Sequence, residues 1–182
     1  MISVIIPHWP KNDYVNGLLE NCRKTLTGYD ELILVVNEGI GFGAAINWGF
    51  KMAKGDYLVL VSNDVEIGDV SKLCDPDAVT CPIVNGLKQE FWGCCFCLPR
   101  WVYEKVGGFD EQFKMAFFED DDYIMRFRQA GIPMRYKEVE AKTLGGQTLK
   151  DMPEKNDFYN ENREKFMKKW GVHSSNPVRY DF

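Results

Sequence analysis

The stretch "ELILVVNEGIGFGAAINWGFKMAKGDYLVLVSND", residues 31–64, decides the fold. Its two ends, 31–37 and 57–62, are short, apolar and rich in β-branched residues, which predicts buried strands. Between them, apolar and small side chains recur at helical spacing from Phe42 to Ala53. A strand, a helix and a second strand with short joins are typical of a parallel α/β sheet with right-handed crossovers. We therefore expect an α/β fold whose ligands bind beyond the carboxyl ends of the strands.

The segments on either side extend this pattern. The run 2–7 predicts another buried strand, and a stripe from Val15 to Leu26 predicts the helix that follows it. No repeat, linker or low-complexity tract indicates a second domain, so we expect one domain over 1–171 and a C-terminal tail over 172–182. After residue 64 the regular alternation ends, and the further expected elements are strands at 79–84, 91–99 and 134–141, and helices from 100, from 119 to 130 and from 157 to a glycine cap at 171.

Composition limits the classes of partner. The 182 residues are 45% hydrophobic, with a net charge of −5 and a pI near 5.1. Because there is no polybasic block, we do not expect a broad surface for nucleic acid or anionic membrane. No apolar run approaches the ~20 residues that cross a bilayer, and the N-terminus lacks the basic start and cleavage site of a signal peptide. We therefore expect a cytoplasmic protein with reduced cysteines.

The run "FFEDDDYIMRF", residues 117–127, places four acids in a row, Glu119 to Asp122. Carboxylates at the start of a helix bind free N–H groups and complement the helix dipole. This explains the position of the acids but not their number, because neighbouring like charges repel one another. A further role is therefore expected for part of the run.

Helical geometry separates the four acids. Asp120 shares a stripe with Tyr123 and Phe127 and so points toward the interior or a cleft. Asp122 lies four residues before Arg126, which predicts an ordinary surface ion pair. Burying a carboxylate costs free energy unless it is hydrogen-bonded or has a functional role that requires it. Asp120 is therefore the candidate general base of the run.

A second acid of interest is Asp64, which follows the predicted central strand in "SND", residues 62–64. A carboxylate at the carboxyl end of a strand is well placed to hold a divalent cation. The alternative, which is the commoner fate of an isolated Asn-Asp pair, is a turn.

The glycine-rich segment 39–44 satisfies G-x-G-x-x-A, which is a dinucleotide-binding pattern. That fingerprint belongs after the first strand of its unit, whereas this segment follows the second. The alternative is a glycine turn that lets a helix pack closely on the sheet. An NAD-binding oxidoreductase is therefore the weaker hypothesis, and it predicts NAD(H) affinity without a metal requirement.

Five segments in register, which together span nearly the whole chain, resemble the family 2 glycosyltransferases of GT-A fold. They are "SVIIP" (3–7), "GFGAAINWGFKMAKGDYLVLVSNDVEI" (41–67), "GCCFCLPRWVYEKVGGFDEQF" (93–113), "FFEDDDYIMRFRQAG" (117–131) and "NREKFMKKWG" (162–171). The resemblance implies a single nucleotide-diphospho-sugar transferase-like domain with a mostly parallel central sheet flanked by helices. It also implies inverting transfer of a hexose or related sugar from a nucleotide-diphosphate donor to an acceptor hydroxyl.

The resemblance also implies roles for particular residues. Asp64 matches the last acid of the family's D-x-D-like motif, which would hold Mg²⁺ or Mn²⁺ on the donor diphosphate. Asp120 matches the aspartate of the E-D pair, the general base, and Glu119 is its neighbour. The acceptor is left open among a glycan, a lipid-linked sugar, a protein and a modified nucleobase. The other implied contacts are Pro7, Asn37, Glu38, Asn47, Ser62 and Asn63 for the donor, and Trp92 and Gly93 for the acceptor.

The chain departs from the family pattern at the metal motif. Its first member is Ser62 rather than an acid, and Thr143 stands where the family often has a histidine, with His173 as an alternative ligand. These changes keep open a GT-A-like binding module that has lost catalysis. Nucleotidyl transfer is a weaker alternative, because "PHWPKND" (7–13) lacks a basic glycine loop.

Overall fold

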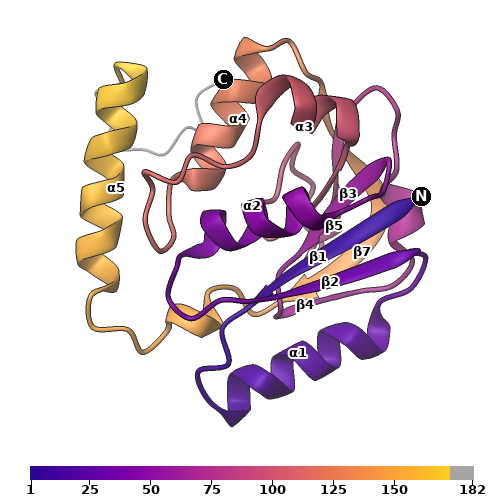
Figure 1. Ribbon diagram of the computed structural model, residues 1–182, viewed down its shortest axis with the longest axis horizontal. Helices are drawn as coiled ribbons and strands as arrows, with labels where there is room; N and C mark the ends of the chain where they lie inside the picture. Colours follow the sequence, from indigo (N-terminus) through magenta and orange to yellow (C-terminus); the bar gives the residue numbers. More distant parts are fainter. Residues whose placement is uncertain (173–182) are drawn as a thin grey trace.

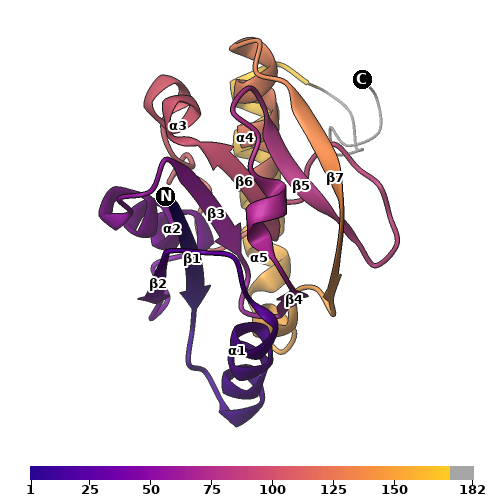
Figure 2. The same cartoon turned by 90° about the vertical axis from the view of Figure 1, so that its right-hand side faces the viewer.

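The computed structural model describes residues 1–172, which include a seven-stranded sheet in the order β2-β1-β3-β6-β5-β7-β4 (Figures 1 and 2). The strands are β1 Ile2–His8, β2 Glu31–Val36, β3 Tyr57–Val61, β4 Val65–Ile67, β5 Val79–Val84, β6 Cys95–Pro99 and β7 Met134–Thr143. The helices are α1 Asp13–Thr25, α2 Phe42–Met52, α3 Arg100–Val106, α4 Glu119–Gln129 and α5 Lys155–Trp170, with short 3₁₀ turns η1 Val70–Leu73 and η2 Gln147–Leu149.

The sheet is mixed but mostly parallel in direction. β1 runs parallel to both β2 and β3, β6 runs antiparallel to β3 and β5, β7 is parallel to β5, and β4 is antiparallel to β7. Five strands, β1, β2, β3, β5 and β7, therefore point one way, and β6 and β4 point the other. The expected mostly parallel α/β sheet is confirmed, as are the expected strands around residues 2–7, 31–37 and 57–62.

Helices cover both faces of the sheet (Figures 1 and 2). On β1, Ile5 joins a core that includes residues of α2, α3 and α4, whereas Val4 and Ile6 join a core that includes residues of α1 and η1. Because side chains alternate between two buried faces, the strand is apolar from Val4 to Pro7, as expected for a covered parallel strand. Gly49 allows α2 to approach closely, since a Cβ at this position would lie 2.3 Å from Ile5 Cγ2.

The second half of the chain was predicted less completely. The expected strand 91–99 is shorter, beginning at Cys95, and β4 was not predicted because it has only three residues. The pairing of β5 with β7 shifts register between Cys81 and Ile83, where Pro82 has no N–H to donate. The last helix ends at Gly171 in a left-handed conformation, as expected. The predicted tail from residue 173 onward, including His173, lies outside the described residues.

None of the helices within residues 1–172 is long and apolar enough to cross a membrane. All six cysteines are free, and Cys95 and Cys97 are buried in β6. Burial raises the pKa of both thiols well above its ordinary value, and for Cys97 a hydrogen bond with Cys74 is the larger cause. Neither thiol is therefore positioned as a nucleophile.

Candidate active site

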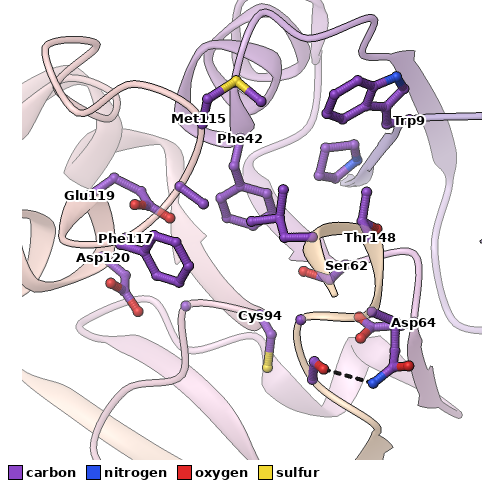
Figure 3. A pocket seen from close by; sticks show the side chains of 18 of the residues that line it. Trp9, Phe42, Ser62, Asp64, Cys94, Met115, Phe117, Glu119, Asp120 and Thr148 are labelled. Carbon is purple, nitrogen blue, oxygen red and sulfur yellow. Dashed lines mark hydrogen bonds between the residues drawn. The ribbon is translucent and has the colours of Figure 1, made fainter. Parts of the chain in front are cut away.

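A cavity of about 440 Å³ lies at the carboxyl ends of β1, β2 and β3 and reaches the start of α4 (Figure 3). Segments that are far apart in the sequence meet here, including the turn after β3, the loop before α4 and the turn η2. Eight of the predicted site residues line the cavity: Pro7, Asn37, Ser62, Asn63, Asp64, Gly93, Glu119 and Asp120.

Asp64 is half-buried in the turn between β3 and β4. Burial raises the pKa of its carboxyl, and hydrogen bonding by Thr143 and the backbone of Gly145 opposes that shift. Thr143 is close because β4 pairs with β7, with Val65 opposite Thr143. Thr143, which replaces the histidine of the family pattern, therefore lies next to Asp64.

Asn63 is held by a buried histidine. Its Nδ2 lies 2.9 Å from Nδ1 of His8, and Nε2 of His8 lies 3.0 Å from Oδ1 of Asn16 on α1. Because an amide nitrogen donates, Nδ1 of His8 accepts and its Nε2–H donates to Asn16. This chain of hydrogen bonds fixes Asn63 at the edge of the cavity.

The acid run lies across the cavity from Asp64. Figure 3 shows Glu119 and Asp120 on the side opposite Ser62 and Asp64. Asp120 is the one acid of the run that is not buried, so its carboxylate faces the cavity, in keeping with its helical position. Two separate anionic sites therefore share one cavity, with room between them for a ligand.

Asp122 does not form the expected surface ion pair. The bond to Arg126 Nε is present at 2.8 Å, but the Asp122 side chain is fully buried. It also accepts hydrogen bonds from Lys169 Nζ at 2.7 Å and from Trp170 Nε1 at 2.9 Å. The prediction was wrong because α5 covers this face of α4, and a pattern local to α4 carries no information about α5.

Gly93 contacts Asp120 directly. A Cβ at residue 93 would lie 2.6 Å from Oδ2 and 2.7 Å from Cβ of Asp120, closer than real Cβ atoms approach their neighbours. The backbone of Gly93 therefore forms the surface on which the Asp120 carboxylate rests. Gly93, which was predicted to contact the acceptor, is therefore also needed to leave space for the Asp120 side chain.

Three predicted residues do not line the cavity. Glu38 is exposed beyond β2, and Trp92 is partly buried against the hydrophobic cores. The side chain of Asn47 is buried and occupied: its Nδ2 donates to Phe109 O and Glu111 Oε1, and its Oδ1 accepts from Phe109 N. The Asn47 amide joins α2 to the G-G-F-D-E segment, which is a structural role.

Much of the cavity wall was not predicted from the sequence. Phe42 and Tyr159 line it, together with the loop before α4 and residues 145–149 around η2. In that loop Met115 and Phe117 have φ of 63° and 79°, and Phe118, which directly precedes α4, has φ of 68°. This left-handed conformation is rare for these residue types. The signal available in the sequence was the cluster of aromatic residues at 113–118 directly before the acids.

The residues present fit a divalent cation held jointly with a phosphate group. Within residues 1–172 there is no cluster of three or more His, Cys, Asp or Glu side chains that could hold a metal alone. Mg²⁺ in such sites is commonly bound by one or two carboxylates together with substrate phosphates and water. Asp64, whose charge is partly desolvated, and the neighbouring hydroxyl of Ser62 are suitable for that arrangement.

Known proteins resemble this chain in structure but not detectably in sequence. No protein-family model and no curated protein matches it. Among solved structures, the Drosophila β1,4-galactosyltransferase 7 catalytic domain with xylobiose has a TM-score of 0.58 at 16% identity, with 80% of this chain and 66% of that chain covered. GalNAc-T7 with UDP, GalNAc and Mn²⁺ has a TM-score of 0.64 at 13% identity, with 93% and 48% covered.

A third neighbour is a mannosyltransferase. The mannosyltransferase PcManGT from Pyrobaculum calidifontis, solved with GDP-Man and Mn²⁺, has a TM-score of 0.54 at 14% identity, with 80% of this chain and 57% of that chain covered. The fold is therefore that of the GT-A-type glycosyltransferases, and family 2 membership stays a prediction. The chain spans 48–66% of the length of these three neighbours.

Proposed function

We propose that this protein is a glycosyltransferase that transfers a sugar from a nucleotide-diphosphate donor to an acceptor hydroxyl, with inversion at the anomeric carbon. The observation that carries the proposal is the placement of Asp64 and Asp120 in one cavity, on opposite sides. The GT-A fold and the nucleotide-sugar complexes of its neighbours support it.

In this mechanism the two acids act on opposite sides of the sugar. Asp120 accepts the proton of the acceptor hydroxyl, whose oxygen forms a bond to the anomeric carbon. The bond from that carbon to the diphosphate oxygen breaks at the same time, and the diphosphate leaves with the bonding electrons. Because attack and departure are in line, the configuration inverts. Glu119 lies beside Asp120 in the cavity and is proposed to orient the acceptor.

The donor end of the cavity is assigned to the strand ends. Pro7, Asn37 and Asn63 border it, and Asp64 would hold Mg²⁺ or Mn²⁺ with the help of Ser62. Such a cation neutralises the diphosphate and stabilises it as a leaving group. The raised pKa of Asp64 accords with this role, because a partly desolvated carboxylate gains more from a nearby cation than an exposed one.

A thermal-shift screen of nucleotide sugars tests the proposal. We expect one nucleotide class to raise the melting temperature in the presence of Mn²⁺ or Mg²⁺, since a ligand at 100 times its Kd adds about 2.7 kcal/mol of stability. In Asp64→Ala this shift is lost, whereas the control Glu66→Ala, an exposed acid two residues away, keeps it. If Asp64→Ala shows the same cation-dependent rise in melting temperature as the native protein, Asp64 does not hold the cation. Stabilisation by NAD(H) alone, without a cation, would favour the oxidoreductase hypothesis instead.

Gly93→Ala is expected to lower donor hydrolysis or transfer by about 10²-fold, because displacing a reacting group by about 1 Å can cost that much. The new methyl group would occupy the place of the Asp120 carboxylate. Steady-state kinetics measures the effect, and the cation-dependent thermal shift should be unchanged. Gly68→Ala is the matched control, because a Cβ there meets nothing within 4 Å. Equal rates in the two variants would show that the position of Asp120 is not critical.

A further inference from the structure

A buried asparagine of α5 contacts the wall of the cavity. The side chain of Asn162 is 1% exposed. Its Nδ2 lies 2.8 Å from Lys114 O, 2.9 Å from Ala116 O and 3.2 Å from Phe117 O. A single amide group thus binds three carbonyls of one loop, across 45 to 48 residues of sequence.

That loop has an unfavourable backbone. Met115, Phe117 and Phe118 all have positive φ, a strained conformation that persists only where the surroundings hold it. On one side, Phe42 N donates to Met115 O at 2.7 Å. On the other side α5 supplies Asn162 and Tyr159, whose ring lies 5.2 Å from that of Phe118.

The loop leads directly into the acid run. Phe118 is the N-cap of α4 and makes no side-chain capping hydrogen bond, so the backbone of the loop determines where the first turn begins. Glu119 and Asp120 are the next two residues, and Phe117 itself lines the cavity (Figure 3). A change in the loop therefore shifts both the cavity wall and the proposed base.

We propose that Asn162 is a positioning residue: its amide holds the loop 114–118 in the conformation that shapes the cavity wall and places Asp120. This inference rests on the proposed function only for its effect on turnover. Asparagine suits the task because it presents an N–H₂ group to carbonyls, while its Oδ1 accepts from Lys165 Nζ at 3.2 Å. Aspartate has the same shape but cannot donate and would place a charge against three carbonyl oxygens.

The test compares Asn162→Asp and Asn162→Ala with Asn160→Asp, the same change at an exposed position of the same helix. Hydrogen exchange of the peptide 112–118 is measured first, since it needs no substrate. We expect exchange about tenfold faster or more in both Asn162 variants, because the loop opens more often. Asn160→Asp should exchange at the native rate. Circular dichroism confirms that each variant is folded, and if Asn162→Asp does not fold, Asn162→Ala carries the comparison.

Turnover separates positioning from a purely structural role. With the nucleotide sugar found in the screen and Mn²⁺, we expect kcat of donor hydrolysis to fall about tenfold or more in the Asn162 variants, with KM for the donor within about twofold. Unchanged exchange in both variants overturns the proposal, and so does faster exchange with native kcat. If the native protein binds no nucleotide sugar, the proposed function fails, and with it the effect on turnover. The exchange comparison then still decides whether Asn162 holds the loop.

Discussion

Asp120→Asn is expected to lower the rate of sugar transfer by about 10²- to 10⁴-fold, the range that general base catalysis contributes. The asparagine keeps the shape of the side chain against Gly93 but cannot accept the proton of the acceptor hydroxyl. Binding of the donor should be unchanged, since the assigned donor contacts lie at the strand ends across the cavity. The measurement is kcat for transfer or donor hydrolysis, alongside the cation-dependent thermal shift.

Two further variants make this result specific. Asp13→Asn, which changes an exposed acid in the first turn of α1, should transfer at the native rate. Asp121→Asn tests the neighbouring acid, which also lines the cavity but is buried. If Asp120→Asn transfers at the native rate while Asp121→Asn does not, the base is Asp121 and the assignment made here is wrong.

Asp122→Ala is expected to lower the free energy of unfolding by about 3–5 kcal/mol, the range found when one partner of a buried ion pair is removed. The carboxylate is fully buried and is bound by Arg126, Lys169 and Trp170. Its removal leaves Arg126 Nε without its carboxylate and removes the bonds from Lys169 and Trp170 of α5 to α4, while Lys169 keeps its ion pair with Asp110. Urea unfolding, followed by circular dichroism, measures the loss.

The control for this variant is Asp157→Ala, an exposed acid in the first turn of α5. It should change stability by about 0.5 kcal/mol or less, as surface substitutions usually do. If Asp122→Ala unfolds at the same urea concentration as the native protein, the buried network around Asp122 does not stabilise the packing of α5 on α4.

Local periodicity was sufficient to predict the parts of the fold that lie close in sequence. The runs at 2–7, 31–37 and 57–62 became β1, β2 and β3. β1 and β3 lie inside the sheet and are buried on both faces, as expected, whereas the edge strand β2 is less buried than expected and exposes Leu34 and Val36. Helical spacing predicted that Asp120 faces the interior or a cleft, and it does line the cavity, but the same spacing did not predict that Asp121 also lines the cavity or that Asp122 is buried. The carboxyl ends of the strands likewise indicated where Asp64 would lie.

The rest depended on contacts that a local pattern does not contain. Asn162 was part of a helix in the sequence analysis, but its three carbonyl partners lie 45 to 48 residues earlier. Asn47 was expected at the donor because of its place in a family motif, whereas its amide is used by Phe109 and Glu111. The left-handed residues before α4 were not foreseen, since nothing in phenylalanine favours positive φ.

The position of α5 also bears on the order in which the molecule assembles. During synthesis the residues proposed to act on the sugar leave the ribosome before α5 does, because Asp64 and Asp120 precede Lys155 in the chain. A nascent chain that ends after α4 carries both acids, but Phe118 and Asp122 have no helix to cover them. Strands β1, β2, β3, β5 and β6 all precede α4 and can pair early, whereas the wall of the cavity is complete only after α5 has emerged.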